Sequence, residues 1–313
     1  MEKRKILVTS YKNPDLDGTA CVFSYAEYLQ KNGKEIVSGI FGTPYREAQF
    51  VINKFNIPPI KNAEELINNY DIVLVDCSEL AGISDKINPD KVIEIIDHRK
   101  LTEARNFPNA KIQIELVGSA ATLIAEKFYE TQTEISEESA VFLFSAIISN
   151  TINFQAKVTT DRDSKMANWL KSKCRIPENY IHEMFSDKSK FDKPLKEIFI
   201  DDFSIFQIEG FKIGIAQLEI IEVDKFISDR LEEIKKVLLD LKQSNSLDFI
   251  FLTCIDIEKL FNKLVIVDNK TKNLIEKTLQ INFKEKIARR EGIIMRKEIV
   301  PKIKEFLEKS NIN

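Results

Sequence analysis

Aspartate residues, and in one case a histidine, follow several apolar segments of the sequence. These candidate site residues are Asp15, Asp17, Asp76, Asp97 and His98. Carboxylate oxygens suit Mg²⁺ or Mn²⁺, and an imidazole nitrogen shifts the preference toward a first-row transition metal. Two such cations held about 4 Å apart can bind both the attacking water and the departing oxygen of an in-line phosphoryl displacement. The pattern therefore predicts a site for phosphoryl transfer that holds up to two Mn²⁺ or Mg²⁺ ions per chain.

Each of these residues also has a plain structural interpretation. An aspartate after a strand is often a turn or cap residue, and Asn13-Pro14-Asp15 is a common type of turn. His98 could be a buried histidine that bonds a neighbour, with Asp97 orienting its ring. Because acidic residues recur after three separate apolar segments, we favour the metal-site interpretation.

The elements that must position these residues follow from alternating apolar and amphipathic segments in the first half of the chain. The expected strands are Ile6–Thr9, Ile36–Ile40, Asp71–Asp76 and Val92–Asp97, and the expected helices are Ala20–Asn32, Arg46–Phe55 and Ala140–Ile148. Near-continuous apolar strands that alternate with helices are typical of a parallel sheet covered on both faces. Such sheets bind ligands beyond the carboxyl ends of their strands, where the acidic residues lie. The predicted fold class is α/β.

A polar segment without apolar periodicity, Ser186–Pro194, predicts a boundary between two domains. We expect a metal-binding catalytic domain at 1–187, a linker at 188–194 and a smaller, mixed α/β domain at 195–313. The second domain should contain a hairpin of Phe203–Ile208 and Phe211–Leu218, a helix Val223–Gln243, strands Phe249–Ile255 and Lys263–Val267, and a closing helix Glu298–Lys309. A chain of 313 residues is long enough for two such cores.

The composition argues against several classes of protein. Lys and Arg number 46 and Asp and Glu 49, a formal charge of -3, so no sequence-wide positive field attracts nucleic acid or membranes. No segment approaches the about 20 apolar residues of a membrane helix, and the N-terminus lacks the apolar core of a signal peptide. Four widely spaced cysteines indicate neither a disulfide framework nor a zinc site. We therefore expect a cytoplasmic protein.

Several segments together resemble the DHH phosphoesterase superfamily. Their order and spacing are most similar to the family II, manganese-dependent inorganic pyrophosphatases and the related exopolyphosphatases. The segments are residues 13–17 (NPDLD), 75–76 (VD), 96–98 (IDH), 117–122 (VGSAAT), 145–149 (SAIIS), 159–163 (TTDRD) and 296–297 (RK). The resemblance covers essentially the whole chain, including a DHHA2-type second domain. It implies hydrolysis of phosphoanhydride bonds, in inorganic pyrophosphate or a short polyphosphate, by a metal-activated water.

Within this resemblance, the metal ligands can be carried over position by position. Asp15 matches a ligand of one metal and Asp17 a ligand of the other. Asp76 matches the carboxylate that bridges both ions, and His98 matches the imidazole ligand of the second. Asp76 and His98 are therefore expected to be catalytic, and Asp97 to support His98 from outside the metal site. The family also implies a homodimer.

Substrate binding is expected from three basic residues, Arg99, Arg296 and Lys297. Arg296 and Lys297 match the family pair that grips the phosphates when the two domains close. A guanidinium can bind two phosphate oxygens at once, whereas lysine supplies a point charge. Arg99 stands where the pyrophosphatases carry a second histidine, and the triplet of residues 97–99 is similar to that of the eukaryotic prune proteins. Arg99 is accordingly expected to be catalytic as well as substrate-binding.

Three further positions depart from the pyrophosphatase pattern. Tyr11 replaces a histidine metal ligand, and its neutral phenol is a poor ligand for Mg²⁺ or Mn²⁺. Asn150 replaces a bridging aspartate, and its uncharged amide cannot bridge two cations. Phe203 stands near the position of a substrate-binding lysine. These departures predict weakened binding of the second cation.

Two other functions remain open on the sequence alone. The first is a non-catalytic sensor of phosphate or nucleotides, in which Tyr11 and Asn150 have disabled the metal site and domain closure supplies the output. The second, minor alternative is hydrolysis of short oligonucleotides, suggested by the basic segment Lys284–Arg290. Against it, the chain lacks a GGGH motif and aromatic residues interleaved with these basic ones. A glycine-rich phosphate loop is also lacking, and His182 is interpreted as structural.

Overall fold

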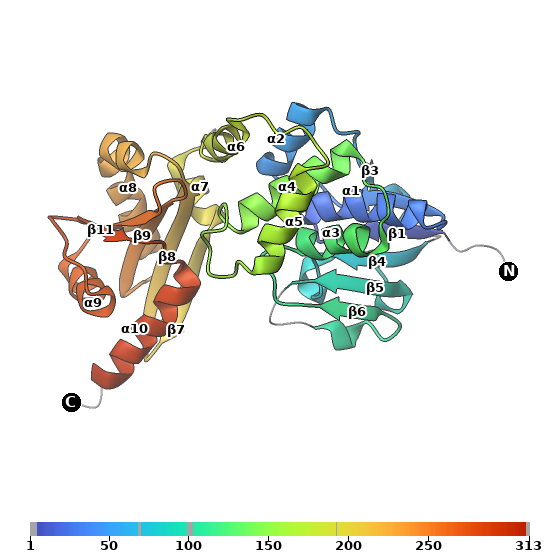
Figure 1. The fold of residues 1–313 in the computed structure, drawn as a ribbon. Coiled ribbons are helices and arrows are strands. Elements are labelled where there is room, and N and C mark those ends of the chain that lie inside the picture. Colours follow the sequence, from blue (N-terminus) through green and yellow to red (C-terminus); the bar gives the residue numbers. More distant parts are fainter. Residues whose placement is uncertain (1–4, 68–69, 99–102, 192, 311–313) are drawn as a thin grey trace. The chain divides into compact units, whose positions relative to one another are not determined.

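The computed structural model describes residues 5–67, 70–98, 103–191 and 193–310. The chain forms two compact units, Met1–Asp187 and Lys188–Asn313, each with its own sheet and helices (Figure 1). One sheet is purely parallel and the other is mixed, which confirms the predicted α/β class. The first unit ends within α6 (Tyr180–Lys188), so the polar segment expected to form a linker from Ser186 is helical at its start.

Six parallel strands form the sheet of the first unit, in the order β3-β2-β1-β4-β5-β6. They are β1 (Ile6–Thr9), β2 (Ile36–Ile40), β3 (Lys61–Asn62), β4 (Asp71–Val75), β5 (Val92–Asp97) and β6 (Lys111–Ile114). The expected strands are present. The two edge strands, β3 and β6, are not predicted because they are short and largely exposed. Since β1, β4 and β5 are neighbours, the residues that follow them meet at one edge of the sheet.

Helices pack on one face of this sheet, where α1, α3 and α4 contact one another (Figure 1). The helices of the unit are α1 (Leu16–Lys31), α2 (Arg46–Phe55), α3 (Ala120–Thr131), α4 (Glu137–Asn150), α5 (Asp161–Lys171) and α6. Helix α1 begins earlier than the expected Ala20, because the side chain of Asp15 accepts a hydrogen bond from the amide of Gly18 at 3.0 Å. Asp17 therefore lies in the first turn of a helix.

The sheet is covered on both faces as expected, but loops and short 3-10 turns, and not α-helices, cover the face opposite α1, α3 and α4. The turns are η1 (Ala63–Glu65), η3 (Leu80–Gly82), η4 (Pro89–Lys91) and η5 (Ala104–Asn106). Leu7, Ile72 and Ile95 of the strands belong to one apolar cluster with Ile83 and Phe107 of the loops. The described connections from β4 to β5 and from β5 to β6 thus contain no α-helix.

Five strands form the sheet of the second unit, in the order β11-β10-β9-β8-β7. Its elements are α7 (Leu195–Asp201), β7 (Phe203–Ile208), β8 (Phe211–Ile220), α8 (Val223–Ser244), β9 (Phe249–Asp256), β10 (Phe261–Ile266), α9 (Asn269–Leu279), β11 (Ile287–Glu291) and α10 (Arg296–Ser310). Separate apolar clusters join α7 and α8 to one face and α9 and α10 to the other. Helix α10 begins at Arg296 instead of the expected Glu298, so Arg296 and Lys297 lie in its first turn.

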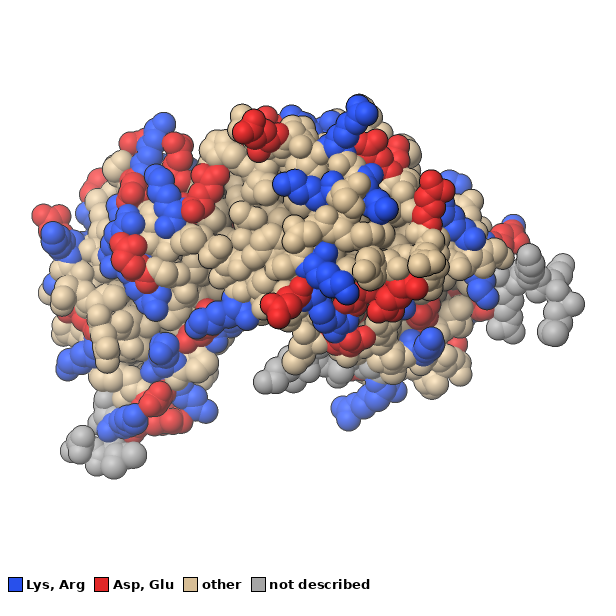
Figure 2. Space-filling model, viewed as in Figure 1, with Lys and Arg blue, Asp and Glu red and all other residues tan. Residues whose placement is uncertain are grey.

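Charged side chains of both signs are spread over the surface. On the face shown in Figure 2, basic and acidic residues are interspersed, in keeping with the formal charge of -3. The basic segment at residues 284–290 leads into β11, where Arg289 pairs with Asp224 and Glu291. Its positive charge is therefore partly neutralised by its own neighbours. In the part of the chain that the structure describes, no helix is both long and apolar enough to cross a membrane.

Candidate metal centre

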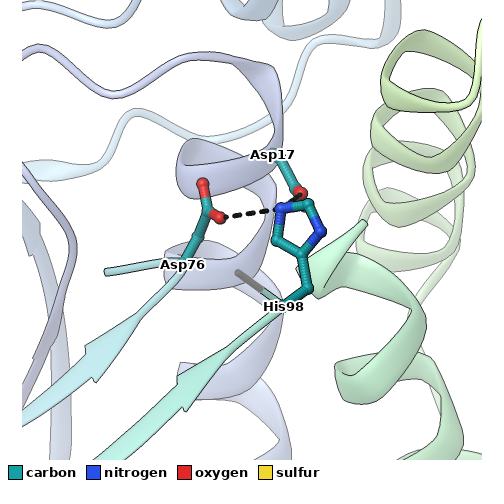
Figure 3. A group of neighbouring side chains, drawn as sticks. All are labelled: Asp17, Asp76 and His98. Carbon is teal, nitrogen blue, oxygen red and sulfur yellow. Dashed lines mark ion pairs between the residues drawn. The ribbon is translucent and has the colours of Figure 1, made fainter. Parts of the chain in front are cut away.

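Three of the predicted metal ligands converge in the first unit, at the carboxyl ends of its central strands. Asp17 lies in the first turn of α1, Asp76 directly follows β4, and His98 directly follows β5 (Figure 3). Their ligand atoms lie within 4.8 Å of one another. The Nε2 atom of His98 lies 3.4 Å from Oδ1 of Asp76 and 3.7 Å from Oδ2 of Asp17.

The backbone at Asp76 takes an unusual conformation that ends β4. Its φ of 54° lies in the left-handed region, which aspartate tolerates better than most residues. Its amide donates a hydrogen bond to the carbonyl of Ile96 at 2.8 Å, which keeps this turn attached to β5. The side chain is buried, and its Oδ1 atom accepts no hydrogen bond from any described residue. A buried anionic oxygen without a donor fits a cation.

A main-chain carbonyl orients the ring of His98. The Nδ1 atom lies 3.0 Å from the carbonyl oxygen of Val117, which leaves Nε2 to face Asp76 and Asp17. A contact of this kind selects the tautomer whose other nitrogen can bind a metal. Asp97, the expected partner of the ring, accepts a hydrogen bond from the main-chain amide of His98 at 2.7 Å. Among the described residues, Val117 thus holds the ring and Asp97 supports the backbone.

Asp17 is held by the first turn of α3 and by Asn150. Its Oδ1 atom accepts hydrogen bonds from the hydroxyl of Ser119 at 2.8 Å and the amide of Ala121 at 2.9 Å. Its Oδ2 atom accepts from the amide of Ala120 at 2.8 Å and the side-chain amide of Asn150 at 2.6 Å. A carboxylate has about four lone-pair sites, so a cation that binds Asp17 must displace one of these donors. Asn150 therefore competes with a cation for Oδ2.

Asp15 and Tyr11 contact each other and do not belong to the converging group of Asp17, Asp76 and His98. The carboxylate of Asp15 caps α1, and its main-chain amide donates a hydrogen bond to the hydroxyl of Tyr11 at 3.0 Å. Burial and then the charges of Asp15 and Asp76 raise the pKa of Tyr11 far above its ordinary value, so the phenol stays protonated. Asp15 lies outside the converging group, whose members among the described residues are Asp17, Asp76 and His98.

Burial dominates the electrostatics of the converging group. It is the largest cause that raises the pKa of Asp17 and that of Asp76 above the ordinary value, and neighbouring carboxylates add to it. Burial alone would lower the pKa of His98, but the carboxylate of Asp76, whose Oδ1 atom lies 3.4 Å from Nε2, and the charge of Asp17 raise the pKa to about 10. Positive charge close to the two carboxyl groups would offset the cost of ionising them. The donor set and its charge fit a divalent cation.

The predicted substrate-binding residues have separate surroundings. Arg99 lies outside the described residues. In the second unit, the guanidinium of Arg296 donates to Oδ1 of Asp202 at 2.6 Å and to the carbonyl of Asp202 at 2.8 Å. Lys297 is exposed on the same helix. Phe203 packs against the apolar cluster of α7 and α8, so this position contributes hydrophobic packing in place of a positive charge.

The loop of residues 117–121 supports the converging group, a role that the sequence did not predict although residues 117–122 are part of the family resemblance. Its first carbonyl holds the ring of His98, and its last residues hold Asp17. The buried carboxylate of Asp163, in the first turn of α5, accepts hydrogen bonds from an amide in the middle of this loop. The spacing of Thr160 and Asp163 is that of a capping box, a local signal for the start of α5 that says nothing of the loop.

Replacing Gly118 in this loop by alanine should destabilise the protein. A Cβ atom there would lie 2.5 Å from Cγ2 of Thr151 and 3.0 Å from Oδ2 of Asp163, so the loop must shift. Overpacking of this kind costs about 1–3 kcal/mol, which should lower the urea midpoint of unfolding. Gly82→Ala is the matched control, since a Cβ there would meet nothing closer than 3.4 Å. An equal loss of stability in both variants would contradict the prediction.

Comparisons with known proteins point to one family over the length of the chain. Residues 5–147 match the family model described as "DHH family, N-terminal domain", and residues 182–306 match that of the "DHHA2 domain". A Clostridium acetobutylicum protein named "Probable manganese-dependent inorganic pyrophosphatase" is 30% identical over 306 residues, which cover 97% of this chain and 98% of that protein. A Staphylococcus epidermidis protein of the same name is 27% identical over 307 residues, which cover 97% of this chain and 99% of that protein.

Comparison with solved structures supports the same family. A crystal structure of a Methanococcus jannaschii protein, assigned to the family II inorganic pyrophosphatases, superposes with a TM-score of 0.70 at 30% identity. The match covers 96% of this chain and 98% of that chain. The sequence and structure comparisons therefore identify the same family.

Proposed function

The chain belongs to the family II, manganese-dependent inorganic pyrophosphatases, and we propose that it hydrolyses the phosphoanhydride bond of inorganic pyrophosphate or a short polyphosphate with a divalent cation. The observation that carries this proposal is the buried group of Asp17, Asp76 and His98, whose donor atoms lie within 4.8 Å of one another. Carboxylates with an imidazole suit Mn²⁺, and such an ion, when bound, supplies an activated water and positive charge beside the phosphate.

Asp17, Asp76 and His98 are proposed to hold one tightly bound cation per chain. Asp76 supports this through its buried oxygen that accepts no hydrogen bond from the described residues, and His98 through the orientation of Nε2. A second cation would need further anionic donors. Tyr11 is a protonated phenol, and the amide of Asn150 donates to Asp17, so neither offers one. Equilibrium dialysis with Mn²⁺ counts the bound ions directly.

Basic residues are proposed to bind and orient the substrate. The guanidinium of Arg296 can bind two phosphate oxygens, and the ammonium of Lys297 adds a point charge. Arg99 would add a positive charge that persists at every physiological pH, unlike that of a histidine. The charge of Arg99 is proposed to stabilise the charge that develops on the phosphate oxygens in the transition state.

Phosphate release from pyrophosphate, tripolyphosphate and a short oligonucleotide, each measured with Mn²⁺, Mg²⁺ or EDTA, tests this function. We expect release from pyrophosphate or tripolyphosphate that depends on the cation, and none from the oligonucleotide. Cation binding without release from any substrate would favour the non-catalytic sensor. Equal release in EDTA would contradict the metal dependence.

Replacing Arg296 by alanine should raise KM for pyrophosphate and change kcat little. The guanidinium is proposed to bind the phosphate equally in the ground state and the transition state, so its loss weakens binding without slowing the chemical step. A hydrogen bond to a charged group contributes about 1.5–3 kcal/mol, which corresponds to a rise in KM of about 10- to 100-fold. Steady-state kinetics at saturating Mn²⁺ measure both constants.

Asp202→Asn is the matched control for this prediction. It removes the charge that pairs with Arg296 inside the second unit, where the two side chains lie 2.6 Å apart, and it leaves the guanidinium in place. We expect KM to change little in this variant. If Arg296 served only to pair with Asp202, both variants would lose similar stability and keep the KM of the unaltered protein, which would overturn the proposed role.

We further propose that the protein acts in the cytoplasm and as a homodimer. Its four cysteines are free thiols, which suits a reducing compartment. The homodimer is suggested by the family alone. Light scattering after size-exclusion chromatography tests it, and a mass near the 36.1 kDa of one chain would contradict it.

A further inference from the structure

We propose that Asp163 is a positioning residue of the metal centre, an inference that rests on the proposed metal-dependent function. Asp163 lies in the first turn of α5, and its side chain is fully buried. None of its hydrogen bonds among the described residues reaches Asp17, Asp76 or His98. It acts on them through the loop of residues 117–121.

The carboxylate of Asp163 ties together the loop, α3 and the start of α5. Both of its oxygens accept a hydrogen bond from the amide of Gly118, at 3.0 and 2.9 Å. Its Oδ1 atom also accepts from the hydroxyl of Thr122 at 2.6 Å, and its Oδ2 atom from the amide and hydroxyl of Thr160 at 2.7 and 2.8 Å. Hydrogen bonds to an ionised acceptor are stronger than neutral ones, so the carboxylate holds these segments firmly.

The loop that this carboxylate holds also holds two of the proposed metal ligands. On one side of Gly118, the carbonyl of Val117 contacts the ring of His98 at 3.0 Å. On the other side, the hydroxyl of Ser119 binds Asp17 at 2.8 Å, and the next two amides bind the same carboxylate. Gly118 therefore lies directly between Val117, which contacts His98, and Ser119, which binds Asp17. A shift of its amide would move the partners of His98 and Asp17 together.

Asparagine is the informative replacement for Asp163, because it keeps the size of the side chain and removes its charge. The groups that surround the carboxylate all donate hydrogen bonds, and two of them are the main-chain amides of Gly118 and Thr160. The side-chain nitrogen of asparagine cannot accept a hydrogen bond. In either placement the amide of Gly118 keeps one of its two acceptors and faces the side-chain nitrogen in place of the other, so the loop loses part of its anchor.

Mn²⁺ binding to Asp163→Asn, measured by equilibrium dialysis and by the EPR signal of free Mn²⁺, tests the proposal. Changes to groups that orient metal ligands weaken metal affinity about 10- to 100-fold, and we expect Kd for Mn²⁺ to rise by that factor. Excess Mn²⁺ should restore most of kcat. KM for pyrophosphate at saturating Mn²⁺ should stay unchanged, because the proposed role concerns the cation site alone.

Asp256→Asn is the matched control. Asp256 is also fully buried, and it accepts hydrogen bonds from the amides of Val223, Glu258 and Lys259 in the second unit. This variant should lose stability through the same chemical change. Its Kd for Mn²⁺ should equal that of the unaltered protein, because Asp256 belongs to the other unit.

Thr122→Val tests the same link with a smaller change and serves if Asp163→Asn does not fold. It removes one hydroxyl that donates to Asp163, and Kd for Mn²⁺ should rise about fivefold. Variants at Asp163 and Thr122 that bind Mn²⁺ as tightly as the unaltered protein, whatever their stability, would overturn the positioning role alone. An unaltered protein that binds no Mn²⁺ would overturn the proposed function, and this inference with it.

Discussion

Asp76→Asn should abolish tight cation binding and cation-dependent turnover while it leaves the fold intact. Asparagine keeps the size of the side chain and tolerates the left-handed backbone at this position, where φ is 54°. It removes the charge next to the buried oxygen that accepts no hydrogen bond from the described residues. Changes to groups that only orient ligands cost about 10- to 100-fold in metal affinity, so loss of a carboxylate ligand should raise Kd for Mn²⁺ more than about 100-fold. Turnover should fall at least about 10³-fold, since a bound cation contributes several kcal/mol to transition-state stabilisation.

Thermal unfolding with and without Mn²⁺ separates this effect from misfolding. Mn²⁺ should raise Tm of the unaltered protein, because a ligand that binds only the folded state stabilises it. It should not raise Tm of Asp76→Asn, and the two proteins should unfold at similar temperatures in EDTA. Asp85→Asn, the same chemical change at a side chain that is 92% exposed, should keep both the Mn²⁺ response and the turnover. Turnover by Asp76→Asn at the rate of the unaltered protein would remove Asp76 from the site.

Asn150→Asp should raise both the number of bound cations and the rate. The side-chain amide of Asn150 now donates to Oδ2 of Asp17 at 2.6 Å. A carboxylate at this position would remove that donor and add negative charge beside Asp17, which favours a second cation. A second ion can bind the departing oxygen as well as the attacking water, so we expect kcat to rise about tenfold or more. Equilibrium dialysis should then count two Mn²⁺ per chain, and phosphate release should report the rate.

The same substitution should make stability depend on the cation. In EDTA the added carboxylate, at a partly buried position, would lie beside that of Asp17 without a cation, which should lower the free energy of unfolding by about 1–3 kcal/mol. Saturating Mn²⁺ should restore it. Asn150→Ala is the control, because it frees Oδ2 of Asp17 without adding charge and should leave one bound cation. If Asn150→Asp also bound one cation and kept the rate of the unaltered protein, the site would be organised around asparagine.

Regular elements with a clear apolar pattern can be predicted from this sequence. The pattern predicts β1, β2 and α2 with the bounds that the structure has, because β1 and β2 are short, largely apolar segments and α2 has apolar residues at helical spacing. The short edge strand β3 (Lys61–Asn62) and the 3-10 turns are too brief to show any period. The start of α1 is misplaced for another reason, since Asp15 reads as a turn residue and in fact caps the helix.

The sequence by itself determined the chemistry available to this protein. Carboxylate and imidazole donors are properties of residue type, and their positions after apolar segments follow from local periodicity. Only the tertiary structure decided which donors meet. Asp17, Asp76 and His98 converge because β1, β4 and β5 are neighbours, while Asp15 caps its own helix and Asn150 binds Asp17 across 133 positions of the chain. Local sequence patterns act over a few residues, so contacts of that separation arise only when the sheet and its helices are packed.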